Sequence, residues 1–283
     1  MTIEIVTTRA AVRHALGATR PGLVPTMGAL HAGHFSLISR SARENPLTVV
    51  SVFVNPTQFS SRGDLDRYPR DLSRDAPAAA NSGADIVFAP DVAEMYPAGF
   101  DTTVEVGALA ERWEGAARPG HFRGVATVVT ILLNLVQPAR AYFGEKDYQQ
   151  LQVVRRFHRD LALPGEIVGC PTIRDEDGLA LSSRNRQLAA ADRAVALAIP
   201  RAIAAVQAAA KAGETNTVQL QRLALDKLTI PGIATDYVAI VDGTTLEPLA
   251  KVAPGARVLI AATAGGVRLI DNDAVSSIGD SLG

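Results

Sequence analysis

The first 170 residues alternate between short apolar runs and segments in which apolar side chains recur at helical spacing. The continuous β-branched run from Leu47 to Val54 is typical of a strand buried on both faces. The expected strands are 22–25, 47–54, 84–89, 139–143 and 167–170. The expected helices are 33–44, 71–82, 120–136 and 147–161. This alternation predicts an α/β fold with a doubly wound parallel sheet and right-handed crossovers.

The pattern changes after about residue 173. An alanine-rich helix is expected at 189–212 and a second helix at 217–228, followed by strand-like runs at 235–241, 257–263 and 267–271. The Gly265-Gly266 pair predicts a tight hairpin between the last two runs. We therefore expect a second, smaller α+β domain at 173–283, after a doubly wound domain at 1–172.

Composition narrows the class of protein. A length of 283 residues suits about two domains, and 47% hydrophobic residues are enough for real cores. The 28 basic and 29 acidic residues nearly cancel, so the global basic charge that nucleic-acid binding requires is absent. The single Cys170 excludes an internal disulfide framework. The first 15 residues lack a signal-peptide pattern and the apolar run 125–136 is too short to span a bilayer, so a cytoplasmic protein is expected.

The segment Pro25 to His34 joins the first of these strands to a helix. Gly28 and Gly33 would let the backbone approach a ligand closely, and a helix N-terminus presents N–H groups and a positive dipole end to phosphate. His31 and His34, three residues apart, could both donate to charge growing on a phosphoryl group. A metal-binding pair, which would need a third ligand, and a simple glycine-rich turn are the alternatives.

Two further segments follow strands and should reach the same edge of the sheet. In one, Lys146 offers a compact cation to phosphate, although a charged turn capped by Asp147 is the plainer interpretation. In the other, Asn55 and Gln58 could hydrogen-bond a hydroxy acid, although Asn55-Pro56 is also a common turn initiator.

Two loops complete the set. Ser182, Ser183 and Arg184 form a donor cluster behind an acidic, glycine-containing approach, so 175–185 is expected to be a mobile flap; a helix start with solvated arginines is the alternative. His121 and Arg123 lie near the start of the long apolar helix, where they suit an anion site or an exposed loop. Because most of these segments fall at strand ends or at the domain junction, together they predict an anion-binding catalytic cleft.

The chain also resembles a known family. His31-Ala32-Gly33-His34 is similar to the H-x-G-H signature of the nucleotidylyltransferase and class I aminoacyl-tRNA synthetase superfamily, and Leu181 to Arg184 is similar to its second, mobile motif. Within that superfamily, the segments 25–34, 54–59, 143–150 and 182–185 together resemble the pantothenate synthetase (pantoate–β-alanine ligase) family, over about 22–271.

The resemblance implies a Rossmann-like ATP- and pantoate-binding domain at 1–172, a smaller α+β lid domain at 173–283 and a homodimer. It also implies that the protein condenses pantoate with β-alanine through a pantoyl adenylate, using ATP and Mg²⁺ and releasing AMP and pyrophosphate. It implies catalytic roles for His34, as proton donor, and for His31, Lys146 and Arg184, and substrate contacts by Gln58 and Gln150. The ATP-binding residues that it implies are Met27, Gly28, Ala29, Leu30, His31, Ala32, Gly33, His34, Gly144, Glu145, Lys146, Asp147, Ile173, Leu181, Ser182, Ser183 and Arg184.

Two positions depart from the family pattern. Leu181 stands where relatives commonly have Met, and Ser73-Arg74 stands where they often carry acidic residues before Asp75. The second departure leaves the protein ligands of Mg²⁺ unknown. A plain nucleotidylyltransferase, a tRNA-binding synthetase-like protein and a non-catalytic nucleotide sensor are the rival interpretations of the same motifs.

Overall fold

The computed structural model describes residues 3–59 and 62–275. The chain folds into two compact units, one formed by residues 1–145 and 149–171 and the other by 146–148 and 172–283. The second unit thus includes a three-residue piece, Lys146–Tyr148, of the segment that links β5 to α8 in the first. The expected division at residue 172 does not include this exchange and stays a prediction.

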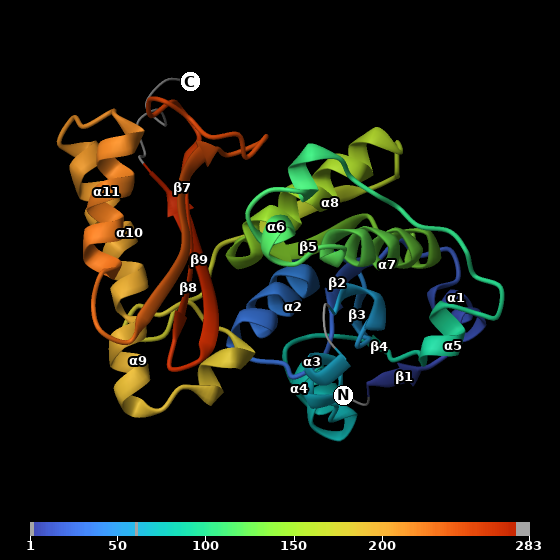
Figure 1. Cartoon of the computed structure of the whole chain (residues 1–283). Helices are drawn as coiled ribbons and strands as arrows, with labels where there is room; N and C mark the ends of the chain where they lie inside the picture. Colours follow the sequence, from blue (N-terminus) through green and yellow to red (C-terminus); the bar gives the residue numbers. More distant parts are fainter. Residues whose placement is uncertain (1–2, 60–61, 276–283) are drawn as a thin grey trace. The chain divides into compact units, whose positions relative to one another are not determined.

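The first unit is built on a parallel sheet in the order β1-β4-β3-β2-β5-β6 (Figure 1). Its strands are β1 (Glu4–Val6), β2 (Gly22–Thr26), β3 (Thr48–Val52), β4 (Ile86–Phe88), β5 (Arg140–Gly144) and β6 (Glu166–Cys170). The chain adds β3 and β4 on one side of β2 and then returns to add β5 on the other. The topological switch point therefore lies between β2 and β5, and their two carboxyl ends open onto the crevice where ligands bind in such sheets.

Helices cover the sheet of the first unit. They are α1 (Arg9–Leu16), α2 (Ala32–Glu44), α3 (Arg62–Arg67), α4 (Leu72–Asn81), α5 (Val92–Met95), α6 (Glu114–Ala117), α7 (His121–Val136) and α8 (Tyr148–Asp160). Short 3-10 turns are η1 (Pro56–Gln58), η2 (Ala108–Ala110) and η3 (Glu145–Asp147).

Alternation along the strands assigns these helices to faces. Val24, Val50 and Val87 lie in register and are buried in one cluster with residues of α2 and α4. Gly169 lies between Val168 and Cys170, which belong to that cluster, so its missing Cβ points to the opposite face, where Leu151 of α8 lies 3.0 Å away. Helices that follow β2 and β5 therefore leave on opposite faces, as a doubly wound sheet requires.

The second unit is a smaller α+β domain with an antiparallel sheet. Its elements are η4 (Ser183–Gln187), α9 (Ala190–Ala196), α10 (Ala198–Lys211), α11 (Thr217–Leu228), β7 (Ile233–Asp242), β8 (Ala256–Ala264) and β9 (Val267–Ala274), with sheet order β7-β8-β9. Gly265 and Gly266, with φ of 55° and 77°, close the β8–β9 hairpin as predicted.

The fold class predicted from the sequence is confirmed, while two details of the elements were wrong. The expected helix at 189–212 is two helices that meet at Leu197. Pro200 has no N–H to donate to the carbonyl of residue 196, which interrupts the hydrogen-bond ladder at the junction. The helix α1 and the short edge strand β1 were missed altogether. Strand β1 has three residues and only one buried side chain, which leaves little pattern.

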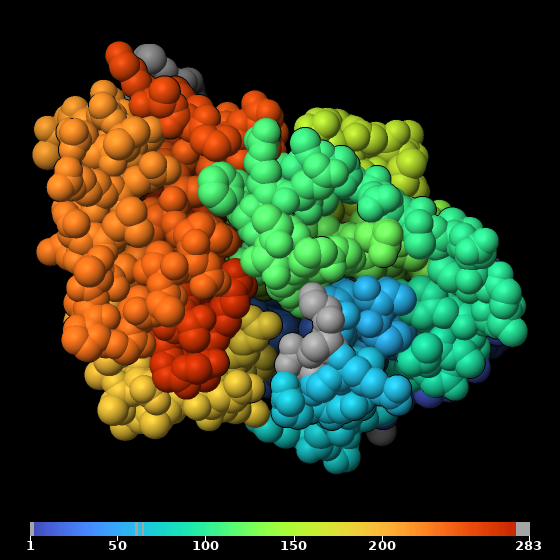
Figure 2. All heavy atoms as spheres, viewed as in Figure 1, coloured from blue at the N-terminus to red at the C-terminus, as the bar shows by residue number. Residues whose placement is uncertain are grey.

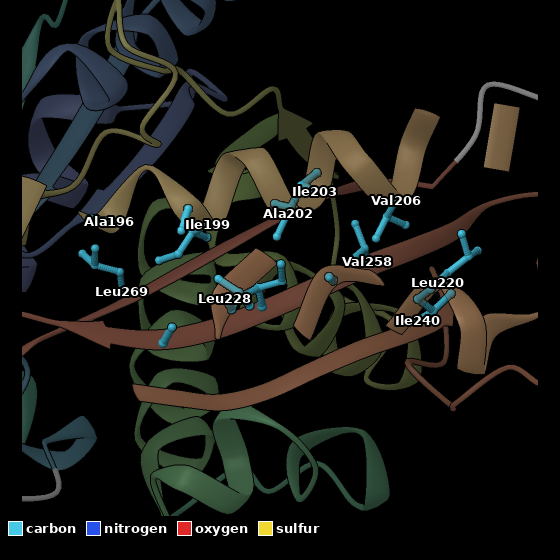
Figure 3. Close-up of a cluster of buried hydrophobic side chains, with 14 of the residues drawn as sticks. Ala196, Ile199, Ala202, Ile203, Val206, Leu220, Leu228, Ile240, Val258 and Leu269 are labelled. Carbon is cyan, nitrogen blue, oxygen red and sulfur yellow. The ribbon is translucent and has the colours of Figure 1, made fainter. Parts of the chain in front are cut away.

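The stretch Ala190–Lys211 is also long and apolar enough to cross a membrane by length and composition. In the structure its apolar side chains form a core instead. Ile199, Ile203 and Val206 pack with Leu220 of α11 and with Ile240 and Val258 of the sheet (Figure 3). The helix is therefore part of the hydrophobic core of the second unit.

The assignment of this core can be tested through the free energy of unfolding. Leu220 is fully buried, whereas Val218 on the same helix is 67% exposed. Leu220→Ala should lower the free energy of unfolding by about 2–5 kcal/mol through lost burial and a residual cavity. Val218→Ala should change it by no more than about 0.5 kcal/mol. Urea unfolding of both variants checks this, and equal losses would contradict the assigned core.

Candidate active site

The loop after β2 is held by one buried carboxylate. Asp75 of α4 is 2% exposed, and its two oxygens accept the backbone N–H groups of Ala29 at 2.7 Å and of Leu30 at 2.9 Å. Ala29 has a φ of 52°, a left-handed conformation that a residue with a Cβ seldom adopts. A Cβ on Gly28 would lie 2.9 Å from Asp75 Oδ2, so only glycine fits there without displacement. The glycine and the carboxylate together fix the shape of this loop.

The two histidines share the first turn of α2. His31 is the N-cap, and its Nδ1 accepts the N–H of Gly33 at 3.2 Å. The Nδ1 of His34 accepts the N–H of His31 at 3.4 Å, and the two rings lie 4.1 Å apart. A neutral imidazole that accepts through Nδ1 carries its proton on Nε2. Each ring is thus held as an Nε2–H donor at the N-terminus of a helix at the switch point.

The metal alternative for this pair finds no support. Within residues 3–59 and 62–275, no group of three or more His, Cys, Asp or Glu side chains could hold a metal ion. Asp75, the acidic residue that follows Ser73-Arg74, has both oxygens engaged by backbone N–H groups. The protein ligands of Mg²⁺ therefore stay unassigned.

Gln58 ends the short turn that follows β3 and reaches the loop after β2. Its Nε2 lies 3.1 Å from Met27 Sδ, and its Oε1 accepts from Asn55 Nδ2 at 3.0 Å. Asn55 is 1% exposed, accepts from the hydroxyl of Tyr96 at 2.7 Å and donates to the carbonyl of Gly124 at 3.1 Å. Asn55 therefore has a buried structural role, and Gln58 lies beside Met27 of the first motif. The substrate contact expected of Gln58 stays a prediction.

The start of α7 packs closely against the turn at Pro56–Gln58. A Cβ on Gly124 would lie 2.5 Å from the Thr57 carbonyl oxygen and 2.7 Å from the Gln58 nitrogen. His121, 7% exposed, places Nδ1 2.8 Å from the Gln58 carbonyl oxygen. His121 thus contacts the backbone of Gln58, which is a structural role. This differs from the expected anion site formed with Arg123.

The two glutamines after β5 have different environments. Gln149 is buried and donates from Nε2 to the carbonyl oxygens of Leu109 and Arg112 while it accepts from the N–H of Glu114. Gln150 is half-buried, and its amide makes no hydrogen bond to any residue that the structure describes. Only Gln150 of this pair keeps an amide available for a ligand.

The cationic motifs meet in a pocket of the second unit. Lys146, Ser182 and Arg184 all line it, together with Arg268 and Asp271 of β9. Ser182 caps η4 and accepts the N–H of Arg184 at 3.3 Å, while Arg184 Nη1 lies 3.4 Å from the Arg268 carbonyl oxygen. The surfaces of the segment around Arg184 and of β9 adjoin where the yellow and red atoms meet in Figure 2. Motifs that lie far apart in the sequence thus contribute to one anion-attracting pocket.

The acidic approach to Ser182 differs from the loose flap that its composition suggested. Arg174 pairs with Ala180 in a β-bridge and binds Asp271 with two hydrogen bonds of 2.7 and 3.0 Å. Arg193 of α9 binds both Asp175 and Asp177, which holds the pKa of Asp177 below its usual range. Asp175 and Asp177 are therefore ion-pair partners of Arg193. The expected ordering of 175–185 when nucleotide binds stays a prediction.

The remaining predicted ATP-binding residues fall into the two units separately. Residues 27–34 and 144–145 belong to the first unit, whereas 146–147, 173 and 181–184 belong to the second. Ile173 and Leu181 are adjacent, since the Leu181 N–H donates to the Ile173 carbonyl at 2.9 Å. Sequence reasoning missed Asp75 and Arg268 as parts of these sites. The one available signal for Asp75 was its place in an expected helix, directly after Ser73-Arg74, where relatives often carry acidic residues.

The carboxylate that holds the loop can be tested directly. Asp75→Asn replaces one of two acceptor oxygens with an NH₂ group that faces a backbone N–H. We expect a loss of about 1–3 kcal/mol in unfolding free energy, with faster hydrogen exchange at the Ala29 and Leu30 amides. Asp71→Asn is the matched control, because Asp71 caps the same helix through one oxygen that Asn retains. Unchanged exchange at residues 29 and 30 would contradict the role of Asp75.

Comparison with known proteins identifies the family. The family described as pantoate-beta-alanine ligase matches residues 3–274. The pantothenate synthetase of Moorella thermoacetica is 50% identical over 276 residues, covering 95% of this chain and 98% of the relative. That of Thermus thermophilus is 53% identical over 271 residues, with 95% and 98% covered.

Solved structures agree with the sequence comparison. The crystal structure of the Thermus thermophilus pantothenate synthetase has a TM-score of 0.93 and 52% identity, covering 97% of this chain and all of that one. The pantoate-beta-alanine ligase of Francisella tularensis, complexed with beta-gamma ATP and beta-alanine, has a TM-score of 0.79 and 33% identity over 97% of this chain and 98% of its own. With its histidine pair at the switch point and a matching sequence over nearly its whole length, the chain belongs to the pantoate-beta-alanine ligase family.

Proposed function

We propose that this ligase joins pantoate to β-alanine through a pantoyl-adenylate intermediate formed from ATP. The observation that carries the proposal is the pair of Nε2–H donors, His31 and His34, at the N-terminus of α2 beside the switch point. A helix N-terminus with preset donors suits a nucleotide phosphate. The Francisella tularensis relative, described as a complex with beta-gamma ATP and beta-alanine, supports the same substrates.

The proposed reaction has two steps. The pantoate carboxylate attacks the α-phosphorus of ATP, the bond to the β-phosphate bridging oxygen breaks, and pyrophosphate leaves. The neutral amine of β-alanine then attacks the acyl carbon, loses a proton and displaces AMP. Adenylation is needed because a free carboxylate has no adequate leaving group, whereas AMP is a good one.

The residues then act by positioning and by stabilising charge. His31 and His34 donate from Nε2 to phosphoryl oxygens on which negative charge builds, with His34 in the position that the family resemblance assigns to the proton donor. Lys146, Ser182 and Arg184 add positive charge and hydroxyl donors to the same nucleotide. Gln58 and Gln150 orient pantoate, and Gln58 also contacts β-alanine. No covalent step on a protein side chain is required, so orientation and electrostatics supply the rate enhancement.

Magnesium enters this proposal only as a partner of the nucleotide. No group of three or more His, Cys, Asp or Glu side chains among the described residues could hold it, and the proposal therefore has the triphosphate of ATP carry Mg²⁺. The same proposal includes a cytoplasmic homodimer, as the family resemblance implies. A plain nucleotidylyltransferase would stop at the adenylated product even with β-alanine present. Pyrophosphate release that requires pantoate, together with amide formation that requires β-alanine, therefore separates the two.

His34 can be tested through the first step alone. His34→Ala should lower pantoate-dependent exchange of pyrophosphate into ATP by about 10²–10³, the usual cost of losing one preorganised donor to developing charge. His158→Ala is the control, because His158 lies near the end of α8, away from the switch point, and its hydrogen bond is exposed. Exchange in His34→Ala close to that of the control would remove His34 from the reaction.

Gln58 should affect one substrate selectively. Gln58→Ala removes an amide that is buried beside Met27 and leaves the phosphate donors in place. We expect kcat/KM for pantoate to fall by about 5- to 150-fold, corresponding to about 1–3 kcal/mol, with little change in the KM for ATP. Gln219→Ala, on the exposed face of α11, serves as the control. Impaired ATP use with unchanged pantoate use would reverse the assignment.

A further inference from the structure

Lys146 follows strand β5 of the first unit, yet its backbone is bound to the second. Asn272 of β9 donates from Nδ2 to the Lys146 carbonyl oxygen at 2.9 Å. Asn272 is 3% exposed, so this hydrogen bond is formed away from water, where a lost partner is most costly. A short segment that interrupts the first unit is therefore attached to the C-terminal sheet at the residue whose side chain lines the cationic pocket.

The amide of Asn272 is itself held in one orientation. Arg257 of β8 donates from Nε to Asn272 Oδ1 at 2.7 Å, which leaves Nδ2 directed at Lys146. The same guanidinium lies over the ring of Tyr148, 3.7 Å from its centroid. A flipped amide would set an NH₂ group against the arginine donor, so Arg257 determines which end of Asn272 faces Lys146.

A third attachment secures the far end of the segment. The Tyr148 hydroxyl donates to the Gly243 carbonyl oxygen at 2.9 Å. A Cβ on Gly243 would lie 2.4 Å from the Gly255 carbonyl oxygen and 3.2 Å from the Tyr148 hydroxyl, so the close approach depends on glycine. The segment 146–148 is thus held by a hydrogen bond to Lys146 and by a stacked, hydrogen-bonded Tyr148.

We propose that Asn272, oriented by Arg257, is a positioning residue for Lys146 in the adenylation step. It fixes the backbone from which the Lys146 side chain extends into the pocket shared with Ser182 and Arg184. The inference rests on the proposed function, which assigns Lys146 to the phosphates. It adds that the cationic pocket is assembled within the second unit, independently of the loop after β2.

The direct test is the isosteric change Asn272→Asp. A carboxylate keeps an acceptor for Arg257 but turns an oxygen toward the Lys146 carbonyl, which repels it. Because a misplacement of about 1 Å can cost about 10²-fold in rate, pantoate-dependent pyrophosphate exchange should fall by about 10- to 100-fold. Gln207→Glu is the matched control: Gln207 also donates an amide hydrogen bond, of 2.9 Å, to a backbone carbonyl of β9, that of Ala274, but this bond is exposed.

A double-mutant cycle separates positioning from general damage to the fold. Lys146→Ala alone should reduce exchange by about 10²–10³. Adding Asn272→Asp to Lys146→Ala should then change exchange by less than about 3-fold, since the side chain that Asn272 positions is gone. Multiplicative losses would show that Asn272 acts through stability instead, and would overturn the proposal.

The outcomes distinguish this inference from the proposed function. Near-normal exchange in Lys146→Ala would refute the role of Lys146 itself, and with it the premise. A severe loss in Lys146→Ala with normal exchange in Asn272→Asp would refute only the positioning role. If Asn272→Asp does not fold, Arg257→Lys takes its place in the same cycle, because lysine keeps the charge but lacks the planar fork that orients the amide. Additive effects of Arg257→Lys and Lys146→Ala would equally overturn the proposal.

Discussion

The active-site geometry of the first unit depends on the buried carboxylate of Asp75. Its two oxygens bind successive backbone N–H groups, at Ala29 and Leu30, and so hold Ala29 in a left-handed conformation that it would otherwise avoid. With the loop turned in this way, α2 begins at Ala32 with His31 as its cap. The carboxylate comes from α4, which follows β3, so the site forms only when consecutive βα units pack together.

In the second unit, too, contacts between distant residues hold the loops, but these contacts are of other kinds. There the anchors are ion pairs and amides: Arg174 to Asp271, Arg193 to Asp175 and Asp177, and Asn272 to the Lys146 backbone. Each of these joins a loop to the sheet β8–β9 or to α9. Lys146, Ser182 and Arg184 thus lie on or next to short segments that such contacts anchor. If they stabilise charge as proposed, this anchoring would limit the reorganisation required.

The sequence predicted the sheet well because continuous β-branched runs such as 47–54 leave few other possibilities. It also predicted that the loops at 27–34, 55–58 and 144–147 follow parallel strands, and such loops share one edge of the sheet. It could not predict the partners of those loops. Asp75 and Asn272 lie 46 and 126 residues from the backbone groups that they bind, and nothing local marks either contact. The partner of Asp175 and Asp177 was missed for the same reason, because Arg193 lies 18 and 16 residues away from them.

The hydrogen bonds of the histidine pair also indicate which of the donors carry a charge. An imidazole that accepts through Nδ1 has a lone pair there, so the capping bonds of His31 and His34 require the neutral rings. Two imidazolium charges with ring centroids 4.1 Å apart would moreover repel by about 4 kcal/mol at an effective dielectric constant of about 20. In this arrangement the pair presents directed N–H donors at the start of α2. Lys146 and Arg184, which are cationic, line a pocket of the second unit with Ser182. In the proposed reaction, neutral donors would lie close together around one phosphoryl group, whereas full charges would be spread over the phosphates that leave.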